Sequence, residues 1–125
     1  MTAGLILFAH GARDPRWAAP FEAVAARVRS QRPGVAVRLA YLELMSPTLP
    51  EAGAELAAAG CTVLSVLPLF LGAGGHVRKD LPQLVANLQT VHPQLQVWLS
   101  PPVGEMDSVI GAMADAALAS LAQEP

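Results

Sequence analysis

Four short apolar runs alternate with four longer segments of helical composition from one end of the chain to the other. The apolar runs, which we interpret as β-strands, are residues 5–9, 35–42, 62–67 and 95–99. The longer segments, which we interpret as α-helices, are residues 15–31, 46–60, 77–91 and 105–122. Strands that are apolar on both faces and are each followed by a helix form a parallel sheet with helices on both sides. The pattern therefore predicts an α/β fold.

Length and composition limit this fold to one small domain. The 125 residues match a single domain spanning 1–125, and because 53% are hydrophobic and only 14% are charged, the composition excludes disorder. We expect a small doubly wound four-stranded parallel sheet, flanked by helices, with the flavodoxin-like strand order 2-1-3-4. Ligands of such sheets bind beyond the carboxyl ends of the strands, where the strand order reverses, which is here between strands one and three.

Charge and sequence pattern argue against several classes of protein. A formal net charge of −2 argues against a nucleic-acid-binding protein. Residues 56–75 carry no charge, but glycines and a proline interrupt them, so we expect a buried strand rather than a membrane span, and residues 1–9 lack the basic start of a signal peptide. The single cysteine, Cys61, excludes an internal disulfide and a cysteine-rich metal site, and it predicts a cytoplasmic location.

Two histidines follow the strands that meet at the predicted ligand-binding edge. His10 comes directly after the first strand, and His76 lies in the loop after the third. Neighbouring strands are about 5 Å apart, so the two imidazoles can meet and share one divalent ion at about 2.1 Å, with its other positions open. The alternative is that each histidine is an ordinary loop residue. We interpret the third histidine, His92, as a contact with a helix dipole at a helix end.

Further ionisable side chains lie near the same edge. Glu43 ends the second strand, where it can hold a cation or accept a proton, although a salt bridge or a helix cap is an equally ordinary role. Half of the eight basic residues follow the two histidines closely: Arg13, Arg16, Arg78 and Lys79. Together they favour a phosphate or polycarboxylate ligand, whereas any one of them alone is explained as solvated surface charge.

Two phosphate-related motifs match the chain poorly. The glycine-rich residues 72–75 lack the third glycine of a dinucleotide-binding loop, and no Lys-Ser/Thr pair follows them. The His10-Gly11 loop is superficially similar to that of the histidine phosphatases, whose signature has an arginine directly before the histidine, where this chain has Ala9. A histidine-dependent phosphate-handling enzyme is therefore only a minor alternative.

Three sequence blocks carry a resemblance to one known family, and the resemblance extends over nearly the whole chain. They are the His10-Gly11 loop, Leu42-Glu43-Leu44 with residues 46–48 nearby, and residues 68–71 leading through glycines to residues 76–82. The family is that of the small CbiX-type sirohydrochlorin chelatases, class II chelatases that insert a divalent metal into a tetrapyrrole. The last block is the most specific of the three.

The resemblance implies a function and a set of site residues. The function is insertion of a divalent metal into sirohydrochlorin during cobalamin or siroheme biosynthesis, with Co²⁺ favoured, Fe²⁺ or Ni²⁺ as alternatives, and no cofactor beyond the substrate metal. His10 and His76 are expected to hold the metal, and Glu43 to act with them in catalysis. The expected contacts with the substrate are Arg13, Arg16, Gly74, Gly75, Arg78 and Lys79.

Two further expectations follow from the resemblance. Longer relatives contain two such domains, so we expect this chain to form a homodimer whose second subunit supplies the other wall of the cleft. The family often has serine where this chain has Ala12, so a hydroxyl contact is missing. The stronger competing hypothesis is a carrier that binds metal or tetrapyrrole without turnover, because a carrier would use the same histidines.

Overall fold

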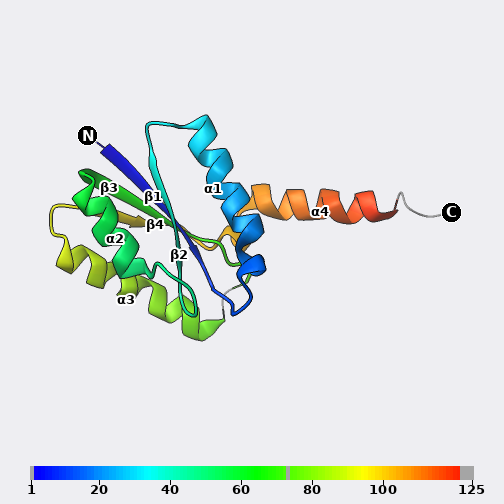
Figure 1. Ribbon diagram of the computed structural model, residues 1–125. Helices are drawn as coiled ribbons and strands as arrows, with labels where there is room; N and C mark the ends of the chain where they lie inside the picture. The colour runs from blue at the N-terminus through cyan, green and yellow to red at the C-terminus, as the bar shows by residue number, and fades with distance from the viewer. Residues whose placement is uncertain (1, 73, 122–125) are drawn as a thin grey trace.

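The computed structural model describes residues 2–72 and 74–121, and in these residues strands and α-helices alternate strictly (Figure 1). The strands are β1 (Thr2–Ala9), β2 (Ala36–Tyr41), β3 (Cys61–Pro68) and β4 (Gln96–Leu99). The helices are α1 (Ala19–Gln31), α2 (Leu49–Ala58), α3 (Gly75–Val91) and α4 (Asp107–Leu121). Two short 3₁₀ turns, η1 (Pro15–Ala18) and η2 (Val103–Glu105), precede α1 and α4.

The strands form one parallel sheet in the order β2-β1-β3-β4, which confirms the predicted fold class and strand order. At the carboxyl end of β1, Ala9 pairs with Tyr41 of β2, and Phe8 pairs with Pro68 of β3. These three strands therefore end at the same edge of the sheet. The residues that follow them are brought together at that edge, as expected for a doubly wound sheet.

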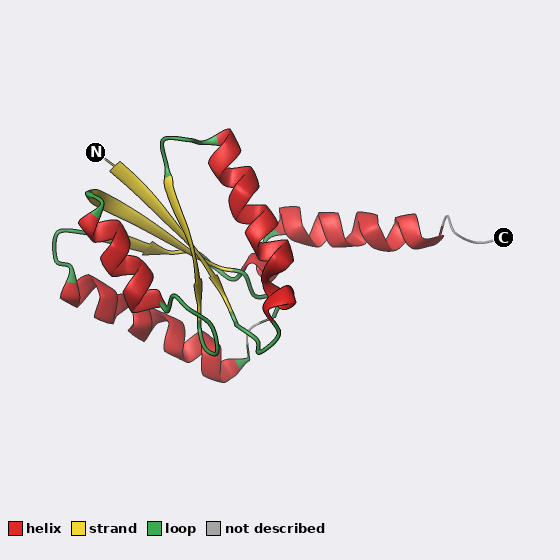
Figure 2. Ribbon diagram, in the orientation of Figure 1, coloured by secondary structure: helices red, strands yellow, loops and turns green. Residues whose placement is uncertain are grey.

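The two faces of the sheet are covered unequally. Helices α2 and α3 lie on one face, and α1 lies on the other, over β1 and β2 (Figure 2). The larger core cluster, under α2 and α3, includes Ile6, Leu56 and Leu88, each at most 4% exposed. A smaller cluster that includes Ala25 and Val37 joins α1 to the sheet. Burial of these apolar side chains fixes the three helices against the sheet.

Helix α4 belongs to neither layer. It projects away from the body of the domain after η2 (Figure 1), and none of its described residues is buried. The sequence pattern predicts helices on both sides of the sheet. On the face that α1 covers over β1 and β2, however, α4 does not cover β3 and β4. No helix within residues 2–72 and 74–121 is long and apolar enough to cross a membrane.

Several predicted boundaries differ from the structure, and the start of every helix is among them. The second predicted helix begins at Leu49 rather than at residue 46, and its N-cap is Thr48, which forms a capping box with Glu51. The first predicted helix begins as the turn η1, and β1 and α3 both begin earlier than predicted. The last helix begins at Asp107 rather than at Glu105, because η2 occupies residues 103–105. Its predicted last residue, Ala122, lies outside the described residues.

Candidate functional site at the sheet edge

The segments that follow β1 and β2 stay paired beyond the ends of the strands. The amide of Leu42 donates a hydrogen bond to the carbonyl of Ala9 (2.9 Å), and the amide of Glu43 donates to the carbonyl of His10 (3.1 Å). His10 and Glu43 are therefore neighbours because of main-chain hydrogen bonds, which persist whatever their side chains do. Strand register thus brings together two of the residues that the sequence marks as functional.

Gly11 makes this close approach of the two segments possible. Its φ is +100°, and a Cβ at this position would lie 1.8 Å from the carbonyl oxygen of Glu43. Only glycine fits both the backbone conformation and the space. The glycine directly after His10 therefore has a structural reason: it allows Glu43 to lie against the His10 loop.

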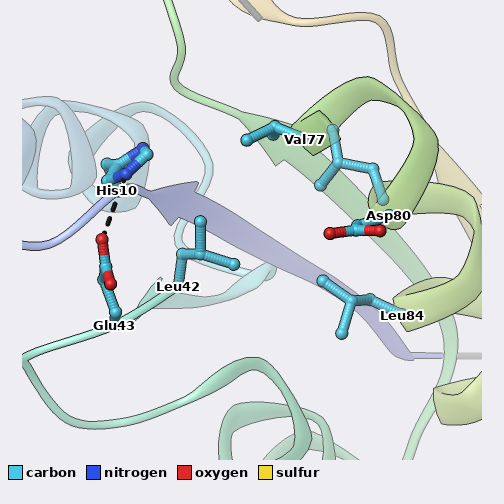
Figure 3. A pocket seen from close by; sticks show the side chains of 7 residues that line it. His10, Leu42, Glu43, Val77, Asp80 and Leu84 are labelled. Carbon is cyan, nitrogen blue, oxygen red and sulfur yellow. Dashed lines mark ion pairs between the residues drawn. The ribbon is translucent and has the colours of Figure 1, made fainter. Parts of the chain in front are cut away.

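The imidazole of His10 faces the carboxylate of Glu43. Nε2 of His10 lies 3.3 Å from Oε1 of Glu43 (Figure 3), and the two side chains are 50% and 56% exposed. On its other side, the His10 ring packs edge-on against the buried ring of Phe70, with 5.8 Å between ring centroids. Sequence patterns alone assigned no role to Phe70. The packing holds the imidazole from behind while leaving its Nε2 side open to solutes.

A cavity of about 400 Å³ opens beside this pair. Figure 3 shows His10 and Glu43 on one side of it and residues of α3 on the other. Apart from the pair, the lining is mostly apolar, and it includes one further carboxylate, that of Asp80. The other lining residues are Leu42, Val77, Leu81 and Leu84. The cavity thus combines polar groups at the strand ends with an apolar wall, as ligand sites commonly do.

Asp80 is the lining residue that sequence reasoning missed. It lies inside the third resemblance block, but no role was assigned to it. Its spacing from Val77 and Leu84 is three and four residues, which places all three on one face of α3. This helical spacing is the sequence signal that identifies Asp80 as a lining residue, provided that α3 is known to border the site.

His76, the second histidine predicted to hold a metal, lies in the first turn of α3. It directly precedes Val77, which lines the cavity. The position of its side chain lies outside what the structure describes, so the meeting of the two imidazoles stays a prediction.

Two of the four basic residues near the edge are paired with carboxylates. Arg16 donates to Asp14 at 2.8 Å, and Arg78 donates to Glu105 of η2 at 2.5 Å. The hydrogen bond from the Arg16 guanidinium lowers the pKa of the Asp14 carboxyl below its ordinary value. The positive charge that the sequence predicts at this edge is therefore partly neutralised.

The remaining predicted substrate contacts lie around the cavity rather than in its wall. Arg13 and Lys79 are exposed, and within the described part of the chain neither makes an ion pair. Gly74 is the N-cap of α3, and Gly75 is its first residue. His92 is the C-cap of α3 and does not line this cavity, which agrees with its interpretation as a helix-end residue.

The donor set of the site is small. Among the described residues, no group of three or more histidine, cysteine, aspartate or glutamate side chains is arranged to hold a metal ion. His10 and Glu43 offer one nitrogen and one oxygen donor, both open to solvent. Such a pair can bind a cation weakly and exchangeably or can move a proton, and the apolar cavity beside it can hold an organic molecule.

The fold and site together define a class: a doubly wound α/β protein with a histidine–carboxylate pair at the carboxyl edge of its sheet. The family model for CbiX matches residues 4–119, which is most of the chain. The chain belongs to the CbiX family. This finding confirms the resemblance that the three sequence blocks indicate.

Individual relatives agree with this assignment. The sirohydrochlorin cobaltochelatase of Methanosarcina acetivorans is 31% identical over 83 residues, which cover 66% of this chain and 64% of the relative. The match thus spans less than two thirds of that relative's length. The crystal structure of a CbiX protein from Marinobacter aquaeolei is 32% identical, with a TM-score of 0.85 over 98% of this chain and 99% of the other.

One more solved structure shares the fold. The sirohydrochlorin chelatase SirB from Bacillus subtilis, in complex with cobalt, has a TM-score of 0.78 to this chain at 22% identity. The match covers 92% of this chain but 49% of SirB. The likeness extends over about half of the longer protein.

Proposed function

We propose that this protein inserts a divalent metal into sirohydrochlorin, with Co²⁺ as the favoured metal. The observation that carries the proposal is the half-exposed pair of His10 and Glu43, 3.3 Å apart, at the border of a cavity in a member of the CbiX family. The relative named sirohydrochlorin cobaltochelatase supports both the tetrapyrrole and the metal. Imidazole also suits Fe²⁺ and Ni²⁺, which stay as alternatives.

The spacing of the pair suits a shared cation. Two donor atoms at about 2.1 Å from one ion lie about 3.0 Å apart in octahedral and about 3.4 Å apart in tetrahedral geometry. The observed 3.3 Å between Nε2 and Oε1 falls in this range. An ion can therefore bind between His10 and Glu43 with little side-chain movement, and its remaining positions are open to water, to His76 and to the pyrrole nitrogens.

Insertion exchanges one divalent cation for two pyrrole protons. Two N–H bonds break, bonds from the metal to the ring nitrogens form, and two protons leave. Glu43 lies beside the ion and can accept a proton as the metal moves to the ring. Asp80 supplies a second carboxylate on the opposite wall of the same cavity. We assign the metal to the His10 side and proton transfer to these carboxylates.

The tetrapyrrole is expected to extend beyond the cavity. The cavity has a volume of about 400 Å³, which is near the lower end of the roughly 300–1,000 Å³ typical of ligand pockets. A macrocycle with peripheral carboxylates needs more space than this. Those carboxylates would then reach Arg13 and Lys79 at the surface. Arg16 and Arg78 can contribute only by exchanging Asp14 and Glu105 for the substrate, so their expected contribution is smaller.

Several finer points belong to the same proposal. The metal is a substrate, so the scheme needs no resident cofactor. We place the reaction in the cytoplasm, where the buried free thiol of Cys61 stays reduced. We assign the product to cobalamin or siroheme biosynthesis. We also propose that the protein acts as a homodimer.

Turnover separates this enzyme from a carrier. Sirohydrochlorin and Co²⁺ are mixed with protein at a concentration well below that of the tetrapyrrole, and absorbance follows metalation. We expect each chain to metalate many molecules. Metalation that stops at one molecule per chain would show a carrier and reject the enzyme. The variant His92→Ala, which alters a histidine outside the cavity, serves as the control and should retain the wild-type rate.

A further inference from the structure

Two leucines are exposed at the edge of the sheet that carries the His10–Glu43 pair. Leu44 lies three residues after the end of β2 and is 59% exposed, and Leu71 lies three residues after the end of β3 and is 65% exposed. Since β1 lies between β2 and β3, the two leucines follow the strands on either side of the one that ends before His10. Within the described residues, neither leucine belongs to a core cluster or lines the cavity. The folded chain thus leaves two large apolar side chains in water at its candidate site.

The backbone of Leu44 is held in an unfavourable conformation. Its φ is +66°, and in the described part of the chain it is the only residue other than glycine with a positive φ. Its loop is fixed on both sides, because the amide of Glu43 donates to the carbonyl of His10 (3.1 Å) and the amide of Tyr41 donates to the carbonyl of Pro47 (2.9 Å). Glycine and asparagine tolerate such a conformation better than leucine does. A leucine is therefore unfavourable here both in its backbone and in its exposure.

Strain of this kind is found at binding sites, where contact with a ligand offsets it. One exposed leucine on a protein surface needs no explanation. Leu44, however, directly follows Glu43, and Leu71 directly follows Phe70, so each is one residue away from a side chain that contacts His10. A ligand that sits over the His10–Glu43 pair and is too large for the cavity is expected to spread over this same edge.

We propose that Leu44 and Leu71 contact the uncharged face of the tetrapyrrole ring and hold the ring over the His10–Glu43 pair. This inference rests on the proposed function, because it takes the ligand to be sirohydrochlorin. The ring is apolar and its carboxylates lie at the periphery, so one ligand can use the leucines for its face and the exposed Arg13 for its rim. Burial of the leucines then adds affinity that salt does not screen, whereas Arg13 adds affinity that salt weakens.

Leu44→Asn removes the apolar side chain but suits the backbone of the loop. Asparagine tolerates a positive φ, so the melting temperature should equal or exceed that of the wild type. The dissociation constant for sirohydrochlorin, measured by fluorescence titration without metal, should rise about tenfold and stay raised at high salt. Leu44→Met keeps an apolar side chain and should bind as the wild type does. A purely structural leucine would give the opposite result, a lower melting temperature with unchanged affinity.

Leu71→Asn provides an independent test, because the φ of Leu71 is not positive. Its affinity for sirohydrochlorin should fall to a similar degree, again independently of salt, but with no gain in melting temperature. Val91→Asn is the matched control, since Val91 on α3 is 69% exposed and does not line the cavity. This control should bind sirohydrochlorin as the wild type does.

The outcomes separate this inference from the proposed function. Unchanged affinity in either asparagine variant, or a loss that disappears at high salt, overturns the inference alone, provided that the wild type binds and metalates sirohydrochlorin. A wild type that does not bind sirohydrochlorin overturns both. Light scattering of the same variants examines the other possible occupant of this edge. A changed mass in solution with unchanged affinity would show that the leucines contact a second copy of the chain, and it would also overturn the inference.

Discussion

The two walls of the cavity are positioned by different kinds of structure. On the strand wall, His10 and Glu43 follow paired strands and are joined by main-chain hydrogen bonds, so strand register sets their separation. On the helix wall, Val77 and Asp80 belong to α3, whose place depends on where the helix begins and on its packing against the sheet. The strand wall thus presents donors at a preset distance, whereas the helix wall supplies shape and charge.

Connections at the two walls differ in strength as well. The start of α3 is tied to η2 by the exposed pair of Arg78 and Glu105, and exposed ion pairs contribute about 0–1 kcal/mol. On the strand wall, replacing the side chains leaves the main-chain bonds in place. Because the strand wall carries both donors, His10 and Glu43, we expect substitutions there to lower the insertion rate more than substitutions that break the exposed ion pair near the helix wall.

The largest effect is expected for His10→Ala. Loss of the only described nitrogen donor in the cavity wall should lower the insertion rate roughly 100-fold at limiting Co²⁺. Because the side chain is half-exposed, circular dichroism and thermal stability should stay close to the wild type. A variant that folds normally and inserts cobalt at the wild-type rate would remove His10 from the site.

Gly11→Ala tests how the strand wall is built. The new Cβ would meet the Glu43 carbonyl at 1.8 Å, and φ is +100°, so Glu43 must move away from His10. We expect a loss of about 1–3 kcal/mol in the free energy of unfolding, and at least a tenfold lower insertion rate. Urea denaturation and turnover are measured together.

Gly72→Ala is the matched control on the other wall. Gly72 lies in the loop before α3 without a positive φ, and a Cβ added to it would have no neighbouring atom within 4 Å. Its stability and rate should therefore stay near the wild type. Equal losses in the two variants would contradict the difference between the walls.

Glu43→Gln separates chemistry from binding on the strand wall. The amide keeps the shape of the side chain but loses the charge that stabilises a cation or takes up a proton, so turnover should fall at least tenfold. The affinity for sirohydrochlorin, measured by fluorescence titration, should change little. Glu55→Gln, a carboxylate of similar exposure that pairs with Arg38, is the control and should alter neither quantity. A defect in binding alone would refute the assigned role.

Arg13→Gln and Arg16→Gln compare a basic side chain that has no ion pair in the described structure with one that is paired to Asp14. Arg13→Gln should weaken sirohydrochlorin binding several-fold at low salt, and the difference should shrink at high salt because exposed charges are screened. Arg16→Gln should have a smaller effect. If the order were reversed, the ion pair with Asp14 would not limit Arg16 as argued.

Thr48→Ala is expected to have the smallest effect on activity, because Thr48 caps α2 and lies outside the cavity. Loss of the cap should cost about 1 kcal/mol in the free energy of unfolding, with an unchanged insertion rate. Urea denaturation and turnover measure the two effects separately. A large loss of turnover would show that the strand wall depends on the start of α2.

The same cap predicts a dependence on pH. The hydrogen bonds from Thr48 lower the pKa of Glu51 below its ordinary value of 4.5 in the folded protein. The resulting stabilisation is present above the unfolded pKa and is lost as pH falls through the folded pKa. In Glu51→Gln, acid unfolding between these two values should therefore be less steep than in the wild type.

Much of the fold was predictable because its sequence signals are local and repeated. Alternating apolar runs and helical segments fix the class of sheet, and chain connectivity limits the strand order. The position of α4 was not predictable, since an apolar stripe such as that of Leu118 and Leu121 indicates burial but not the surface that buries it. Helix starts differed because short turns such as η2 have no strong pattern of their own.

The candidate site was predictable where it depends on strand ends. His10 and Glu43 follow neighbouring strands, and parallel strands end at one edge, so their meeting follows from the topology. The part that Asp80 plays in the site depends on which face of α3 meets the cavity, and the part that Phe70 plays depends on its packing behind the His10 ring. Neither feature can be predicted from the local sequence. The pair of Arg78 with Glu105 joins residues from distant parts of the chain, and only the folded structure brings them together.

The central claim is that the metal enters the reaction at the pair of His10 and Glu43. The most direct test is the initial rate of sirohydrochlorin metalation as a function of Co²⁺ concentration in the wild type and in His10→Ala, at saturating tetrapyrrole. The account predicts that the variant needs far more Co²⁺ to reach half of its maximal rate, while its dependence on sirohydrochlorin is unchanged. An unchanged Co²⁺ dependence, with or without a lower maximal rate, would contradict it.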